Sequence, residues 1–228
     1  MPYLRHIKSI SSVWPHVRYL ADWMEITTAP PKWKFLSPEN RKDRASRASV
    51  AMLDFQPGKA ATRTNLRTIE DLSKVLHDPV QNHDAVDARL FVVEDLSRAV
   101  IEALGARFDI DPLFFRGQLS DYLWYNTRDP WVELPDLDAV SRQRTHFHLR
   151  YIRATFFKTE DSFKKATWQA GSFNVLRRVE DDKNHKAVLD GEGTKVALVR
   201  SKSSLWIRPN KTHESGVLGA CGTSCTTF

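Results

Sequence analysis

The chain has 228 residues, of which 41% are hydrophobic and 27% are charged. This length suits one domain with extensions or at most two small domains, and the composition is typical of a globular protein rather than a disordered chain. Its two cysteines exclude a disulfide framework. A membrane-spanning helix is not expected, because it needs about 20 mostly apolar residues and no run approaches that length.

The net charge of +6 is concentrated near the N-terminus. Residues 1–50 hold nine Lys/Arg against four Asp/Glu (+5), and the rest of the chain holds 25 against 24 (+1). The first residues lack the apolar region of a secretory signal, so we expect a cytoplasmic protein. Residues 1–48 are interpreted as a basic, partly flexible extension that docks in part through aromatic side chains such as Trp14 and Trp23.

The domain is expected over residues 49–209. A short apolar run at 49–55 and a threonine-rich run at 61–66 predict two strands, and the Pro-Gly pair between them predicts a hairpin. Thr68 then has the position of an N-cap, and the apolar residues that follow it fall on one face of a helix.

A buried strand is predicted at 89–95, because this run is apolar and rich in β-branched residues. The next segment, 96–108, has leucine, valine and phenylalanine at helical spacing and predicts an amphipathic helix. Asp111 followed by proline predicts the start of another helix.

Further strands are predicted at 145–151, 171–179 and 194–200, and the run 203–209 that follows is either part of the last strand or a fourth one. The fold class is therefore α/β (α+β), with a mixed β-sheet sandwiched between helices. We expect the following side chains to be mostly buried: Leu90, Val92, Leu104, Phe108, Phe147, Leu149, Phe173, Val175 and Leu198.

Several sequence segments resemble the cytosolic N-terminal domain of fungal CorA-like magnesium transporter proteins. They are the run from Arg89 to Asp138, which contains FDIDPLFF (108–115), and the stretches SRQRTHFHLRY (141–151), AGSFNVLRR (170–178) and LVRSKSSLWIRPN (198–210). The resemblance covers about residues 49–217. It implies a soluble α/β/α sandwich that, in the family, precedes a stalk helix and two membrane helices and assembles as a pentamer with magnesium between neighbouring domains.

The chain departs from that family plan. Its three methionines are outside any Gly-Met-Asn loop, and no stalk or membrane helix is expected after Pro209. Residues 210–228 are interpreted as a divergent tail. Transport activity is therefore not implied, and a truncated gene product is one expectation.

Candidate site residues are few. Asp109 and Asp111 are weak candidates for a magnesium site, because a D-x-D pair presents oxygen ligands to a hard cation, although Asp111 also suits an N-cap. His146 and His148 share one face of a strand, but no third zinc ligand is indicated, so a solvated strand face is the interpretation. No nucleophile–base pattern, phosphate loop or dinucleotide motif occurs, and we expect no enzyme and no firmly implied cofactor.

The sequence leaves three functional hypotheses. The first is a soluble regulatory or oligomerisation domain, resembling the cytosolic part of a CorA-like divalent-cation transporter, that associates with itself or with full-length CorA-like subunits. The second is a basic module that uses residues 1–50 on an acidic partner, such as an anionic membrane surface or, less in keeping with the charge, nucleic acid. The third is a non-functional truncated product.

Overall fold

The structure is a computed structural model, and it describes residues 1–27, 36–77, 86–119, 143–174, 195–208 and 215–221. Within these residues it contains a six-stranded sheet with the strand order β2-β1-β3-β6-β5-β4. The strands are β1 (Val50–Phe55), β2 (Thr62–Leu66), β3 (Ala88–Val93), β4 (His146–Phe157), β5 (Lys195–Arg208) and β6 (Ser215–Cys221). β3 and β6 are parallel and the other neighbours are antiparallel, so the predicted mixed sheet is confirmed.

The described helices are α1 (Pro2–Ile10), α2 (Pro15–Ile26), α3 (Pro38–Ser46), α4 (Ile69–His77), α5 (Arg98–Phe108), α6 (Pro112–Leu119) and α8 (Glu160–Ser172). Local sequence explains several of their starts. The side-chain oxygens of Thr68, Ser97 and Thr159 accept hydrogen bonds from backbone N–H groups three residues further on, at 3.1, 3.2 and 3.2 Å. Each bond satisfies an N–H that a helix start otherwise leaves unpaired.

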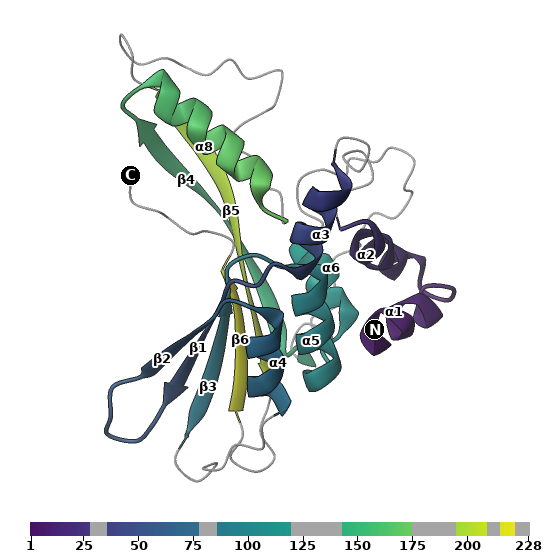
Figure 1. Ribbon diagram of the computed structural model, residues 1–228. Coiled ribbons are helices and arrows are strands. Elements are labelled where there is room, and N and C mark those ends of the chain that lie inside the picture. The colour runs from purple at the N-terminus through teal and green to yellow at the C-terminus, as the bar shows by residue number, and fades with distance from the viewer. Residues whose placement is uncertain (28–35, 78–85, 120–142, 175–194, 209–214, 222–228) are drawn as a thin grey trace.

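Helices α4, α5 and α6 lie against one face of the sheet (Figure 1), and α1, α2 and α3 pack onto α5 and α6. The core lies between these helices and the sheet. Phe108 of α5 places its ring 5.8 Å from the ring of Phe91 and 6.1 Å from that of Trp206. The sheet and the helices contribute these buried side chains: Val50, Met52, Phe91, Val93, Trp206, Leu72, Val100, Leu104, Phe114 and Phe115.

The N-terminal helices belong to this core. Ile7 of α1 and Leu20 and Met24 of α2 are fully buried, and Trp23 is 3% exposed, whereas Trp14 is 51% exposed. The described part of the expected extension therefore packs onto the domain through the apolar sides of α1 and α2, and its partial flexibility stays a prediction. The basic composition of the segment concealed this, because its charged residues occupy the outer sides of α1 and α2.

Glu102 of α5 holds the start of α1. Its carboxylate oxygens accept hydrogen bonds from the backbone N–H groups of Tyr3 and Leu4, at 2.8 and 2.9 Å, and α1 has no side-chain cap of its own. The Tyr3 hydroxyl donates to the carbonyl of Ile110 at 2.5 Å. The Tyr3 ring lies over Gly105, where a Cβ atom would be only 2.5 Å from it.

The outer parts of β4 and β5 form a long antiparallel pair, and α8 packs against it (Figure 1). The rings of Phe157 in β4 and Phe163 in α8 are 5.4 Å apart, at right angles. Side chains alternate between the two faces of a strand, and the β4–β5 pairing runs without interruption. Phe157 therefore shares a face with Phe147 and Leu149, and α8 lies on the opposite side of the sheet from α4 to α6.

The burial predictions were only partly correct. Leu104 is buried, and Leu90, Val92, Phe108 and Phe173 are half-buried. Phe147 and Leu149 were predicted to be buried but are 54% and 56% exposed. Val175 and the side chain of Leu198 lie outside the described residues.

The register of β4 explains the error at Phe147 and Leu149. His146 and His148 pair with Trp206 and Ser204 of β5, both of which face the helices. The histidine side of β4 therefore faces the core, and its apolar side faces away.

The strand predicted at 171–179 also needs correction. Gly171 and Ser172, predicted to begin a strand, are the last residues of α8, and 175–179 lie outside the described residues. The runs 194–200 and 203–209, for which the sequence left one strand or two open, form one strand, β5. The described residues also contain β6 and α8, which were not expected from the sequence.

Candidate functional site

The candidate site is the sheet face that α4, α5 and α6 do not cover, here called the open face. The cross-strand register brings its residues together. Ala51 pairs with Val92, Val92 with Gly219, Gly219 with Leu205 and Leu205 with Phe147, so these positions form one row across five strands. Residues paired in register point to the same face. The described apolar side chains of the open face are Leu53, Phe55, Leu90, Val92, Phe147, Leu149, Leu205 and Ile207.

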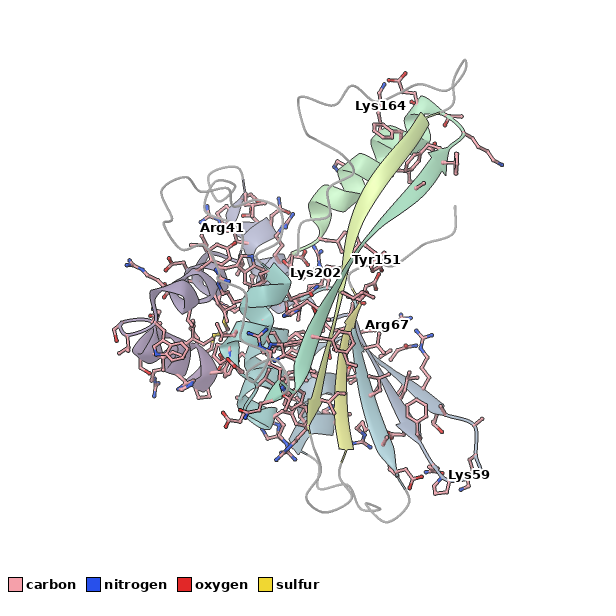
Figure 2. The ribbon with its side chains drawn as sticks, turned by 180° about the vertical axis from the view of Figure 1, so that it is seen from behind. Arg41, Lys59, Arg67, Tyr151, Lys164 and Lys202 are labelled. Atoms are coloured by element: carbon pink, nitrogen blue, oxygen red, sulfur yellow. The ribbon has the colours of Figure 1, made fainter. Side chains whose placement is uncertain are left out.

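These side chains are accessible to solvent. Phe55 and Ile207 are 40% and 42% exposed, in addition to the still more exposed Phe147 and Leu149, and the other four are half-buried. Figure 2 looks at the sheet from the side opposite to α4, where Tyr151 and Arg67 are labelled. Among the described helices, α8 packs on the open face by residue alternation, and its aromatic contact lies at the far end of β4. A contiguous exposed apolar surface of this kind commonly marks an interface.

The covered face contains a polar network where α6 meets β4 and β5. The Ser204 hydroxyl donates a hydrogen bond to Gln118 Oε1 and contacts His148 Nδ1, so His148 donates from Nδ1. Lys202 Nζ donates to the carbonyl of Gly117. The His148 ring stacks on Phe114, with the ring centres 5.6 Å apart.

This network excludes the solvated strand face proposed for the two histidines. His146 and His148 both contact Phe114 of α6 and are half-buried. The Ser204–His148 contact is also unsuited to nucleophilic catalysis, because Ser204 is 3% exposed and its hydroxyl is already directed at Gln118. We therefore assign the network a role in positioning α6 against the sheet.

The two aspartates proposed for magnesium have structural roles. Asp109 ends α5 in the left-handed conformation, with φ of 52°. Asp111 starts α6, and its Oδ1 accepts a hydrogen bond from the N–H of Leu113 at 2.9 Å. Within the described residues no group of three or more His, Cys, Asp or Glu side chains is arranged to hold a metal ion. Magnesium binding at Asp109 and Asp111 stays a prediction.

Several basic side chains of the first 50 residues already contact carboxylates. Lys8 pairs with Glu25, and Arg47 pairs with Asp43 and lies 3.6 Å from Asp95. Arg44 donates to the carbonyl of Phe173 at 2.9 Å. Part of the positive charge that suggested an acidic partner is thus engaged within the fold.

The open face could not be recognised as a site from the sequence. The alternation of residues 146–151 was visible, but it defines two faces without showing which one the helices cover. The lateral order of the strands, which decides this, depends on pairing between distant segments.

No protein-family model matches the chain, and no curated protein sequence matches it. None of the described helices combines the length and apolar character needed to cross a membrane.

Proposed function

We propose that the chain is a soluble, cytoplasmic regulatory or oligomerisation domain, resembling the cytosolic part of a CorA-like divalent-cation transporter, without transport activity of its own. The phrases quoted from residues 89–138 and 141–210 suggest this family, and a mixed sheet with helices is consistent with it. The observation that carries the oligomerisation role is the open face. The free energy falls when another surface covers exposed aromatic and aliphatic side chains, because apolar surface is removed from water.

We assign a second copy of this chain as the partner of the open face. Toward β4 the face presents Leu205 and Phe147, which carry no charge that would select an acidic or basic partner. Two copies related by a twofold axis present the same apolar surface to each other, and such a symmetric contact is the commonest form of self-association. Two sheets packed in this way lie about 10 Å apart and interdigitate their side chains.

The test is the mass of the full chain in solution as a function of concentration, measured by analytical ultracentrifugation. We expect a monomer–oligomer equilibrium that the Phe147→Ser, Leu149→Ser double variant shifts to monomer. Burial of each side chain contributes about 1.5–3 kcal/mol, so the double variant should weaken association by at least about a hundredfold.

Phe156→Ser is the matched control. Phe156 lies on the same strand and is 72% exposed, but it belongs to the other face by alternation. Association of this variant should be unchanged. A wild-type chain that stays monomeric, or a control variant that loses association to the same extent as the double variant, would contradict the proposal.

A further inference from the structure

A second feature lies at the β2 end of the open face. A hollow of about 570 Å³ opens there, and its lining includes Arg63, Asn65, Arg67, Ser49 and Glu94. Binding sites for small molecules have volumes of about 300–1,000 Å³. The hollow is thus large enough for a small organic ligand. It is separate from the exposed Phe147 and Leu149, which lie on the same face at the opposite edge of the sheet, on β4.

The β2 strand directs positive charge into the hollow. β2 is an edge strand. Arg63 and Asn65 are two residues apart on it, and Arg67 follows directly after its end. The three side chains therefore point to the same face of the sheet. Arg63 Nε donates to Asn65 Oδ1 at 3.0 Å. This bond holds the Arg63 guanidinium beside the Asn65 amide and leaves the terminal NH₂ groups of Arg63 and the amide NH₂ of Asn65 as further donors.

Neither arginine is neutralised within the described structure. Among the described residues, no carboxylate forms an ion pair with Arg63 or Arg67. Arg89 on β3 differs from these two arginines, because it forms a two-point ion pair with Asp54 on β1, at 2.6 and 2.9 Å. The acid in the hollow, Glu94, accepts a hydrogen bond from the Ser49 hydroxyl at 2.8 Å.

The rest of the lining is apolar. Ala51 and Val92 lie next to each other in register and point to this face, and Ala48 adds a third small side chain. The site therefore combines two guanidinium groups and an amide on one wall with a small apolar floor. Guanidinium groups bind carboxylate and phosphate through paired N–H donors.

We propose that this hollow binds a small organic anion, through a carboxylate or phosphate group held by Arg63, Asn65 and Arg67 and an apolar body placed over Ala51 and Val92. An exposed pair of arginines would also serve to block pairing of the edge strand with another chain. An edge-blocking role does not need the apolar floor beside these arginines, whereas a site for an organic anion does. A ligand with both parts therefore discriminates between the two roles.

The experiment is a calorimetric titration of the full chain at constant ionic strength with phenyl phosphate, phenylacetate and inorganic phosphate. We expect phenyl phosphate or phenylacetate to bind with a millimolar or lower Kd, and inorganic phosphate to bind more weakly because it lacks the apolar body. The stronger of the two aromatic probes identifies phosphate or carboxylate as the preferred group. Equal affinity for inorganic phosphate and both aromatic probes, or no heat with any of them, would overturn the proposal.

The Arg63→Gln, Arg67→Gln double variant should lose at least about tenfold in affinity for the stronger probe, because each charge-assisted hydrogen bond contributes about that factor. Both side chains are exposed, so the variant should fold, and its circular dichroism checks this. Lys59→Gln is the matched control. Lys59 is an exposed cation in the turn between β1 and β2 (Figure 2), and it does not line the hollow. An equal loss in the control would show that general charge attraction, rather than the hollow, binds the anion.

Discussion

Tyr3 shows how one side chain joins distant parts of the chain. Its ring rests on Gly105, its hydroxyl donates to Ile110, and its backbone N–H donates to Glu102. The contact needs a glycine because a Cβ atom at position 105 would be 2.5 Å from the ring, well inside van der Waals distance. In sequence terms Gly105 is only a weak helix former in α5. The glycine is needed because it lets Tyr3 of α1 approach the backbone of α5 closely.

Gly105→Ala tests this contact. Alanine favours a helix by about 1 kcal/mol over glycine, but the clash with Tyr3 should outweigh that gain and lower the free energy of unfolding by about 1–3 kcal/mol. In a Tyr3→Ala background the clash is absent, and the same substitution should stabilise the protein by up to about 1 kcal/mol. Urea unfolding of the four proteins measures both effects. A stabilising effect of Gly105→Ala in both backgrounds would show that Tyr3 does not occupy this position.

At the scale of elements, α6 is fitted closely to β4 and β5. Gly117 permits this, because a Cβ atom there would lie 2.4 Å from His148 Nε2. The Ser204 hydroxyl then joins His148 on β4 to Gln118 on α6. Buried polar groups require such partners, since an unpaired one costs about 1–3 kcal/mol. The network thus specifies how the helix sits on the strands in a way that apolar packing alone does not.

Ser204→Ala should lower the free energy of unfolding by about 1–3 kcal/mol, because Gln118 Oε1 and His148 Nδ1 lose this partner in a buried place. Ser203→Ala is the matched control, one residue away on the half-exposed open face, and should change stability by no more than about 0.5 kcal/mol. Chemical denaturation of the two variants makes the comparison. Equal losses would indicate that the hydroxyl of Ser204 has no special role.

For the whole molecule, the parts that the sequence predicted are those set by neighbouring residues. The hairpin of β1 and β2, the strand β3, the helix α5 and the starts of α4 and α6 follow from turn residues, β-branched runs, helical spacing and caps such as Thr68 and Asp111. The face of β4 could not be predicted in the same way. It depends on the pairing of His148 with Ser204, 56 residues later in the chain.

The same reasoning explains what else was missed. β6 lies between β3 and β5 in the sheet although it comes last in the described chain, and nothing in residues 215–221 indicates that position. The open face and the hollow beside β2 exist only after this order is established. Of the candidate site, the sequence supplied the residue types but not their grouping.

The helical layer formed by α1 and α2 carries two tyrosines whose ionisation links it to pH. Burial raises the pKa of Tyr3 far above its usual value, and the nearby carboxylates of Asp111, Asp109 and Glu102 raise it further. Burial also raises the pKa of Tyr19 strongly, although Arg116 opposes this. The folded protein thus keeps both phenol protons at pH values where the unfolded chain releases them.

The free energy of unfolding should therefore be independent of these groups below pH about 10, the ordinary tyrosine pKa, and should fall above it. Because the folded state then binds more protons than the unfolded state, the slope is negative, at about 1.4 kcal/mol per pH unit for each tyrosine. Urea unfolding between neutral pH and pH about 11.5 measures the slope. The Tyr3→Phe, Tyr19→Phe double variant should lose most of it, even though removal of the hydroxyl bonded to Ile110 lowers its stability at neutral pH. A variant that is less stable at neutral pH but keeps the full alkaline slope would show that the two phenols do not anchor α1 and α2 in their neutral form.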